Sequence, residues 1–276
     1  MTIDAHQHFW NYDPVRDAWI DDSMQVIQKD FLPKDLKPEL DKKGINGCIA
    51  VQADQSKDET QFLLHLAREN PWIKGVVGWV DLSSPNLEAQ LESYLIEENL
   101  FGFRKILQSL PPSAMEEKAF LKGIGLLTKF GFTYDILIFP KQLEAAFQLA
   151  RQFPNQAFVV DHMAKPDIKN QEFDFWAKGI QKLASLPNVY CKVSGMVTEA
   201  DWGSWKKKDF IPYLDHITHY FGTERLIYGS DWPVCLLAGT YEKVYDLVYD
   251  YYNEFSETEK KAIFGMNACN FYGIEI

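Results

Sequence analysis

Short apolar stretches recur along the chain and alternate with longer stretches in which apolar residues return every three or four positions. Most of the short stretches are apolar on both faces, which is typical of strands in a buried parallel sheet. The stretches that fit this pattern are Thr2–Phe9, Gly47–Gln52, Gly75–Leu82, Gly102–Gln108, Thr133–Phe139, Ala157–Asp161, Val189–Val193 and Arg225–Tyr228. Their order predicts eight strands that follow one another with helices between them.

The longer stretches carry their apolar residues on one stripe, as amphipathic helices do. The last of them opens on Ser256 with Glu259 three residues later, which is the pattern of a capping box. Helices are expected at Glu59–Asn70, Asn86–Glu98, Lys141–Phe153, Tyr241–Phe255 and Glu257–Phe264.

Eight strands alternating with helices predict a (β/α)₈ barrel, which residues 1–276 would form as one domain. The alternative is an open, doubly wound sheet, which often carries a glycine-rich phosphate loop. Neither GxGxxG nor GxxxxGK[ST] occurs in the sequence. The proline-containing segment after Trp10 is expected to be a long first loop. One polar residue marks the end of each strand, at spacings that suit one strand–helix unit per step: His8, Gln52, Asp81, Arg104, Asp135, Asp161, Ser194 and Asp231.

Composition narrows the class of partner. The chain has 276 residues, 46% of them hydrophobic, and a formal net charge of −11 at pH 7. This acidic balance argues against nucleic acid or an anionic membrane as the main partner. No apolar run is long enough to span a bilayer, and the first residues, MTIDAH, lack the features of a signal peptide. Because Cys48, Cys191, Cys235 and Cys269 show no CxxC spacing, we expect reduced thiols in the cytoplasm.

Polar side chains gather where the predicted strands end. In a (β/α)₈ barrel these ends meet at one mouth, where catalytic groups lie. His6 and His8 share one face of the first strand because alternate side chains of a strand point the same way. Taken singly, each polar residue has a structural explanation such as a helix cap or an ion pair, but their joint placement favours a functional site. His65, His216 and His219 fall in helical stretches and are expected at the surface or in packing.

Six motifs distributed along the chain carry a resemblance to a known family. They are DAHQHFW at the first strand, GFRKILQ at the fourth, VVDHMAKP at the sixth, YCKVSGM at the seventh, YGSDWPV at the eighth and NACNFYG near the end. Together they resemble the amidohydrolase superfamily, in particular the amidohydrolase-2 group that contains sugar lactonases acting on L-fuconolactone and L-rhamnonolactone. The resemblance implies a distorted (β/α)₈ TIM barrel and a hydrolase that opens a lactone ring at its carbonyl.

The resemblance also implies roles for residues at the strand ends. The aspartate of strand eight, Asp231, would act as general base on the attacking water. The histidines of strands one and six, His6, His8 and His162, would bind or polarise the carbonyl, and Arg104 of strand four would hold the substrate. These roles agree with the chemistry, because lactone hydrolysis needs a base, donors for the oxyanion and an acid for the leaving alkoxide.

Aromatic side chains near the strand ends are candidates for contact with a sugar ring. Trp10, Trp79 and Trp232 offer flat apolar faces, with packing in the core as the alternative for each of them. Tyr134 on the fifth strand is expected to assist Arg104 in holding substrate oxygens.

Metal-dependent members of the superfamily usually add a histidine on strand five and often a bridging ligand on strand four. Here strand five offers Tyr134 and Asp135, so a two-metal centre is not expected. A single divalent ion, zinc by preference, is expected on His6, His8 and Asp231, since three ligands plus water form a catalytic zinc set. The lactonase branch includes members that work without metal, so binding of an ion and a requirement for it are separate questions.

Three functions are weighed in this order. The first is a hydrolase that opens a sugar-acid lactone, an aldonolactone similar to L-fuconolactone. The second is a metal-dependent decarboxylase of the same superfamily, which the missing histidine of strand five disfavours. The third is a non-catalytic sugar-binding barrel, which the presence of Asp231 and of the paired histidines disfavours. The expected partner is a small-molecule sugar lactone, and a homo-oligomer is left open.

Overall fold

The computed structural model describes residues 1–275, and its centre is a sheet of eight parallel strands in sequence order. Each strand pairs with the next one along the chain. The strands are β1 (Ile3–Gln7), β2 (Gly47–Val51), β3 (Ile73–Gly78), β4 (Leu100–Ile106), β5 (Thr133–Leu137), β6 (Phe158–Val160), β7 (Val189–Val193) and β8 (Leu226–Tyr228). All eight overlap the predicted stretches, and the largest differences are at strand ends, where the apolar pattern runs on into loops.

The seam between β8 and β1 closes the sheet into a barrel. Gln7 forms a parallel bridge with Trp232, just beyond the end of β8. Two backbone hydrogen bonds flank it: the Asp231 N–H donates to the His6 carbonyl at 2.8 Å, and the His8 N–H donates to the Trp232 carbonyl at 2.7 Å. The predicted (β/α)₈ barrel is therefore confirmed, and its closure puts the residues after β8 beside the end of β1.

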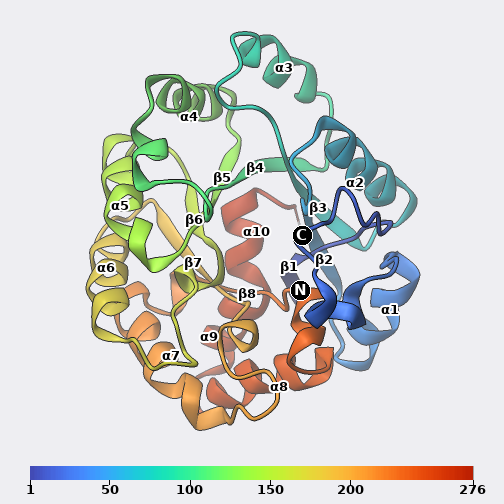
Figure 1. The fold of residues 1–276 in the computed structure, drawn as a ribbon, viewed down its shortest axis with the longest axis vertical. Coiled ribbons are helices and arrows are strands. Elements are labelled where there is room, and N and C mark those ends of the chain that lie inside the picture. Colours follow the sequence, from blue (N-terminus) through green and yellow to red (C-terminus); the bar gives the residue numbers. More distant parts are fainter. Residues whose placement is uncertain (276) are drawn as a thin grey trace.

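Helices surround the strands (Figure 1). One helix from α1 to α8 follows each strand, and two short helices complete the chain. The last predicted helix begins as expected, with the Glu259 N–H donating to the Ser256 hydroxyl, but it ends at Lys261, where a π-helical turn starts. The helices are α1 (Pro33–Lys42), α2 (Lys57–Glu69), α3 (Leu87–Tyr94), α4 (Lys118–Phe130), α5 (Leu143–Gln152), α6 (Asp174–Ala184), α7 (Lys207–Phe221), α8 (Tyr241–Tyr251), α9 (Glu257–Lys261) and α10 (Asn267–Tyr272).

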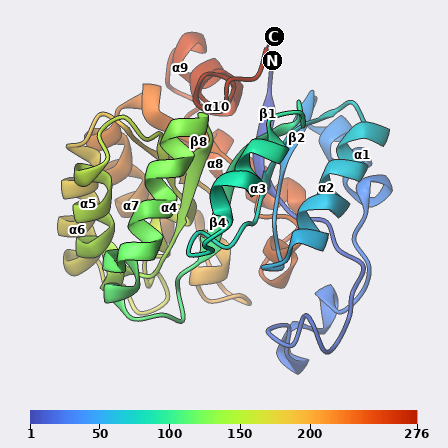
Figure 2. The ribbon, with the colours of Figure 1, turned by 90° about the horizontal axis from the view of Figure 1, so that it is seen from above.

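The strands separate two hydrophobic layers. The outer layer lies between strands and helices, and the inner layer fills the barrel. In Figure 2, α10 and both termini lie at one end of the molecule, while the long loop after β1 projects from the opposite end. Since α10 contributes apolar side chains to the inner layer, it covers the amino end of the barrel. The inner layer consists of Ile3, Ala5, Ile49, Val51, Val77, Val159, Ile227, Ala268, Cys269, Phe271, Tyr272 and Ile274.

The connection from β1 to α1 is the long first loop that the sequence predicts. Trp10 and Phe31 pair through reciprocal backbone hydrogen bonds of 3.0 and 2.9 Å, so the two ends of the loop are held together. The Trp10 ring also donates its Nε1–H to the Lys29 carbonyl at 2.9 Å. Trp19, within the loop, packs edge-on against Trp10 with the ring centroids 6.1 Å apart. The loop thus carries two indole rings to the mouth of the barrel.

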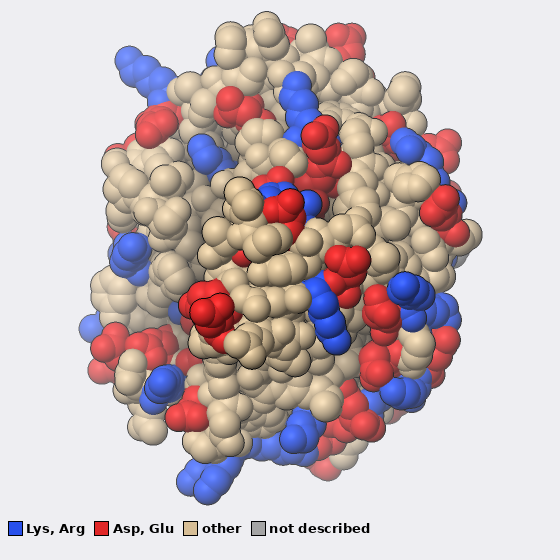
Figure 3. Space-filling model, turned by 45° about the vertical axis from the view of Figure 1, so that its right-hand side comes forward, with Lys and Arg blue, Asp and Glu red and all other residues tan. Residues whose placement is uncertain are grey.

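Acidic and basic side chains are interspersed on the face shown in Figure 3. Of the helices that the structure describes, none combines the length and the apolar character needed to cross a membrane. The helical histidines lie away from the barrel mouth, as predicted: His65 and His219 are exposed, and His216 packs against Trp176 with ring centroids 5.3 Å apart.

Candidate functional site

A cavity of about 260 Å³ opens at the carboxyl ends of the strands. It combines a large apolar surface with a few polar groups that come from distant parts of the chain, which is the usual composition of a small-molecule site. Its apolar side chains are Trp10, Trp19, Ala53, Ile106, Leu137 and Val234, and its polar side chains are His8, Arg104, Gln108, His162, Lys165 and Asp231.

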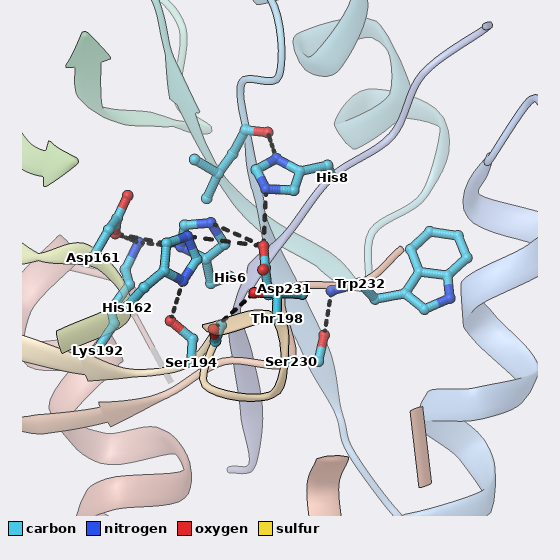
Figure 4. Close-up of polar contacts among 12 residues, drawn as sticks. His6, His8, Asp161, His162, Lys192, Ser194, Thr198, Ser230, Asp231 and Trp232 are labelled. Carbon is cyan, nitrogen blue, oxygen red and sulfur yellow. Dashed lines mark hydrogen bonds and ion pairs between the residues drawn. The ribbon is translucent and has the colours of Figure 1, made fainter. Parts of the chain in front are cut away.

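Three imidazoles converge on one oxygen of Asp231 (Figure 4). The Oδ1 atom of Asp231 lies 3.4 Å from Nε2 of His8, 3.8 Å from Nε2 of His162 and 3.9 Å from Nε2 of His6. All four side chains are buried, and His6, with no exposed surface, lies beneath the other three. The structure therefore brings together the four residues for which catalytic roles are predicted.

A β-bulge in β1 aims both histidines at Asp231. The register of β1 against β2 shifts between Asp4 and Gln7, so that β1 has one extra residue there. Ala5 faces the barrel interior, and strict alternation would therefore turn His6 toward the outer layer. With the bulge, His6 and His8 both face the mouth of the barrel.

A hydrogen bond to a neighbouring strand decides which nitrogen of His8 carries the proton. Nδ1 of His8 lies 2.7 Å from the carbonyl oxygen of Val51 at the end of β2. A carbonyl oxygen can only accept, so Nδ1 donates and Nε2 of the neutral ring keeps its lone pair. This lone pair points at Asp231, an arrangement that suits a cation or a donor between the two groups.

His162 is held by a strained turn and by a glycine. It is the first of four consecutive non-glycine residues with positive φ, at 53°, 53°, 60° and 50° through Lys165. Such a conformation costs roughly 1–2 kcal/mol for each residue with a Cβ. Nδ1 of His162 lies 2.9 Å from the Ser194 hydroxyl. A Cβ at Gly195 would stand 2.4 Å from the same nitrogen, so only glycine leaves room for the ring there.

Burial and charge set the protonation of the cluster. Burial holds the pKa of His6 and of His162 well below the usual range of histidine, so both rings are neutral at neutral pH. Burial alone would raise the pKa of Asp231, but the neighbouring imidazoles of His162 and His8 lower it below its usual value. The site therefore presents a carboxylate beside the neutral imidazoles of His6 and His162.

Arg104 divides its guanidinium between the cavity and a buried carboxylate. One terminal nitrogen donates to Oδ2 of Asp161 at 3.0 Å and lies 3.3 Å from Nε2 of His6. The other terminal nitrogen donates to the carbonyl of Gln52. Arg104 is 3% exposed and lines the cavity, so it is both a structural partner of Asp161 and a candidate substrate contact.

A buried lysine lies under the cluster. Lys192 on β7 has no exposed surface, and its Nζ lies 2.5 Å from Asp135, 3.0 Å from Asp161 and 3.2 Å from Nδ1 of His6. The hydroxyl of Tyr272 on α10 donates to Asp135 at 2.9 Å. Burial alone would raise the pKa of Asp161, but the charges of Lys192 and its neighbours hold that pKa well below the usual range. Hydrogen bonds and ion pairs through Asp135 and Lys192 thus connect α10, at the amino end of the barrel, to His6.

The residues around Asp231 fit a single divalent ion. His6, His8 and Asp231 each offer one donor atom within 4.8 Å of the others. The free Nε2 of His8 and the ionised Asp231 are the deprotonated forms that a metal requires. Two imidazole nitrogens and one carboxylate oxygen would supply three ligands, which together with a water match a catalytic zinc set.

Two residues predicted to bind substrate lie outside the cavity. Tyr134 has no exposed surface, and its ring packs between Phe120 and Phe158 with centroids 6.0 and 6.1 Å away. The side chain of Trp232 points away from the three histidines (Figure 4) and packs edge-on against Phe31 at 5.1 Å. In both cases a position near a strand end suggested the mouth of the barrel, but the side chain turns toward the outer layer.

Among the polar and aromatic side chains of the cavity, the sequence pattern assigned no role to Trp19, Gln108 and Lys165. Trp19 lies in the long first loop, where no periodic pattern indicates the direction of a side chain. Lys165 stands in the VVDHMAKP motif, but its direction depends on the left-handed turn that precedes it. Its place in a motif at the end of a strand could have indicated Lys165 as a site residue, whereas nothing in the sequence pattern indicated Trp19.

The chain is similar to proteins of a known hydrolase family. The model of the family described as amidohydrolase (Amidohydro_2) matches residues 3–274. The chain is 36% identical to an L-fucono-1,5-lactonase of Burkholderia multivorans, over 99% of this chain and 96% of that protein. It is 24% identical to an L-rhamnono-gamma-lactonase of Scheffersomyces stipitis, over 63% of this chain and 59% of that protein.

Solved structures show the same barrel. The crystal structure of an amidohydrolase from Burkholderia multivorans with bound zinc is 36% identical, covers 100% of both chains and gives a TM-score of 0.94. A probable 2-pyrone-4,6-dicarboxylic acid hydrolase from Acinetobacter baumannii gives a TM-score of 0.79 at 20% identity, covering 99% of both chains, and shares the fold.

Proposed function

The chain belongs to the amidohydrolase family, and we propose that it is a lactonase that opens the ring of a sugar-acid lactone, an aldonolactone similar to L-fuconolactone. The observation that carries the proposal is the convergence of three buried imidazoles on Asp231 at a cavity of small-molecule size. The similarity to two curated L-fucono-1,5-lactonases, at 36% and 34% identity, supports the class of substrate.

Asp231 is the general base of the proposed reaction. It takes a proton from water, and the water oxygen forms a bond to the carbonyl carbon of the lactone. The tetrahedral intermediate then breaks the bond between this carbon and the ring oxygen, and Asp231 returns the proton to the leaving oxygen. The product is the open hydroxy acid. Because the pKa of Asp231 lies below its usual value, the carboxylate is ionised at neutral pH and able to accept the proton.

Donors at the cavity stabilise the negative charge that develops on the carbonyl oxygen. Arg104 lines the cavity and carries a permanent charge. His162 donates from Nε2 when its Nδ1 accepts a hydrogen bond from the Ser194 hydroxyl, 2.9 Å away. Donors that are already in place when the charge appears stabilise the transition state without reorganising.

His6, His8 and Asp231 are the residues that would hold a divalent ion. When bound, such an ion supplies Lewis-acid polarisation of the carbonyl and lowers the pKa of bound water. The Val51 carbonyl supports this assignment because it keeps the proton of His8 on Nδ1.

An assay of lactone opening tests the proposed function. Each turnover releases an acid, so a panel of sugar lactones with a pH indicator reports hydrolysis directly. We expect enzyme-dependent acid release with at least one aldonolactone. Decarboxylation of aromatic acids without lactone hydrolysis would identify the decarboxylase instead. Calorimetric binding of a sugar lactone without turnover would identify a sugar-binding barrel.

Metal binding provides a second test. We expect the protein to bind one equivalent of zinc per chain, and His8→Ala to weaken that affinity by about tenfold or more, since it removes a ligand. Competition with a chelating indicator and elemental analysis measure affinity and stoichiometry. His65→Ala, at an exposed histidine of α2, is the control. Two equivalents per chain, or unchanged affinity in His8→Ala, would contradict the ligand set, and activity after chelation shows separately whether the ion is required.

Arg104→Met tests the substrate contact. We expect kcat/KM for the lactone to fall about 10- to 100-fold, the effect of losing a hydrogen bond from a charged donor, roughly 1.5–3 kcal/mol. The protein should remain folded because Asp161 keeps Lys192 as a counter-charge. Steady-state kinetics and thermal unfolding separate the two effects, with Arg68→Met at an exposed ion pair as control. An unfolded Arg104→Met protein would show that the arginine acts through structure alone.

A further inference from the structure

The connection after β6 contains a rare backbone element. The φ angles of His162, Met163, Ala164 and Lys165 are 53°, 53°, 60° and 50°. Residues with a Cβ disfavour the left-handed region and usually enter it singly. Strained residues of this kind persist only where the surrounding structure holds them, and they cluster at functional sites. A run of four therefore calls for a functional explanation.

The turn places His162 and Lys165 on the same side. The dihedral angles of its first two residues, with ψ of 34° and 28°, mirror those of a 3₁₀ turn, in which residues three apart eclipse each other. His162 and Lys165 both line the cavity, whereas Met163 and Ala164 between them have no exposed surface. An ordinary right-handed turn would not present these two side chains to the cavity in this way.

Three contacts hold the turn and aim the lysine. The Lys165 N–H donates to the His162 carbonyl at 2.8 Å. Trp176 of α6 is fully buried and donates its Nε1–H to the Met163 carbonyl at 2.6 Å. Nζ of Lys165 donates to Glu199 at 2.9 Å, and an ammonium group has two further N–H donors. Both side chains of this ion pair are 18% exposed, so the pair is partly shielded from water.

We propose that Lys165 is a specificity residue that donates a hydrogen bond to a ring hydroxyl of the sugar lactone while the carbonyl lies at His162 and Asp231. This inference rests on the proposed function. The group that it binds is a neutral oxygen, because Glu199 already balances the charge of the ammonium. Trp176 is a positioning residue that acts through the turn.

Lys165→Met tests the contact, because it keeps the aliphatic stem and removes the donors. The substrates are a sugar 1,5-lactone and δ-valerolactone, which has the same ring and carbonyl but no hydroxyl groups. We expect the ratio of kcat/KM for the sugar lactone to that for δ-valerolactone to fall about 10- to 100-fold, mainly through KM of the sugar lactone. Lys169→Met, at an exposed lysine of the same connection, should leave this ratio unchanged.

Trp176→Phe tests the positioning role, because it keeps an aromatic ring and removes the donor to Met163. We expect the same ratio to fall, and no further fall when Trp176→Phe is combined with Lys165→Met. A role in packing alone would lower the melting temperature and leave the ratio between the two lactones unchanged.

An unchanged ratio in folded Lys165→Met, or equal losses on both lactones, would overturn the proposal. Failure of the proposed function looks different, since the unsubstituted protein would then hydrolyse neither lactone. In that case calorimetry compares binding of the sugar lactone to the unsubstituted protein and to Lys165→Met. Binding weakened about tenfold or more by the substitution supports the contact. Equal affinity, or no binding by the unsubstituted protein, overturns it.

Discussion

Asp231→Asn should lower kcat for the lactone by ~10²–10⁴-fold while the protein stays folded, as expected for loss of a general base. Asparagine keeps the shape of the side chain and its capacity for hydrogen bonds, but an amide does not take a proton from water. Of the described residues that line the cavity, only Asp231 carries a carboxylate, so no neighbour in the cavity can replace it. Steady-state kinetics with the pH indicator measure kcat, and calorimetry measures whether the lactone still binds.

Asp4→Asn is a matched control for this experiment. Asp4 is an equally buried carboxylate at the same seam, but it accepts from the Ser230 N–H at 2.9 Å and from the Tyr241 hydroxyl at 3.0 Å, away from the cavity. Its substitution should lower the free energy of unfolding, and it should lower kcat far less than Asp231→Asn does. Near-normal kcat in folded Asp231→Asn would refute the mechanism. Asp161 would then be tested next, although it faces Arg104 and Lys192 beneath the cavity.

Lys192→Met should destabilise the fold by about 3–5 kcal/mol, the cost of removing one partner from a buried ion pair. Lys192 is fully buried between Asp135 and Asp161, at 2.5 and 3.0 Å. Arg104 remains beside Asp161 in the variant, but Asp135 keeps only the Tyr272 hydroxyl. Urea unfolding of the variant and of the unsubstituted protein measures the difference in the free energy of unfolding.

An exposed ion pair and a paired substitution separate charge from packing. Lys207→Met removes a lysine that pairs with Asp250 at the surface, and it should change stability by no more than about 1 kcal/mol. Adding Asp135→Asn to Lys192→Met removes the uncompensated carboxylate, so the double variant should regain part of the lost stability. A loss in Lys192→Met no larger than in Lys207→Met would show that the buried network does not stabilise the barrel.

The loss in Lys192→Met should also depend on pH. Burial raises the pKa of Asp135 to about 6 even beside Lys192. An acid with a raised folded pKa binds more protons in the folded than in the unfolded state, so its contribution to stability falls as pH rises from about 4 through the folded value. Without the positive charge of Lys192 the folded pKa of Asp135 should be higher still, so this contribution to stability continues to fall at higher pH. Unfolding in urea should therefore show a larger destabilisation at pH 8 than at pH 5, and an equal loss at both would contradict a charged Asp135.

The architecture and most of the candidate site could be predicted from the amino-acid sequence. Eight apolar stretches separated by helical periods predict the barrel, because burial of both faces of a parallel sheet leaves a pattern that local residues carry. Polar residues at the strand ends predict the cluster around Asp231, because parallel strands of a closed barrel end at one mouth. The motif resemblance added the class of reaction.

The direction of several side chains could not be predicted from the sequence, because it depends on contacts between distant segments. On β5, Asp135 faces Lys192 inside the barrel and Tyr134 packs against Phe120, so the Tyr134 side chain does not reach the cavity where it was expected to contact substrate. Trp232 follows Asp231 directly and yet packs in the outer layer against Phe31. One residue along a strand reverses the direction of a side chain, and the apolar pattern of a doubly buried strand does not record which face is which.

The backbone departures that complete the site also depend on contacts between distant segments. His6 reaches Asp231 because β1 has a bulge and because the barrel closes across the seam. Lys165 reaches the cavity because Trp176 and neighbouring contacts hold a left-handed turn that these residues would not adopt alone. Local sequence favours the commonest backbone conformations, so a strained one becomes stable only when packing and hydrogen bonds from elsewhere in the chain offset its cost.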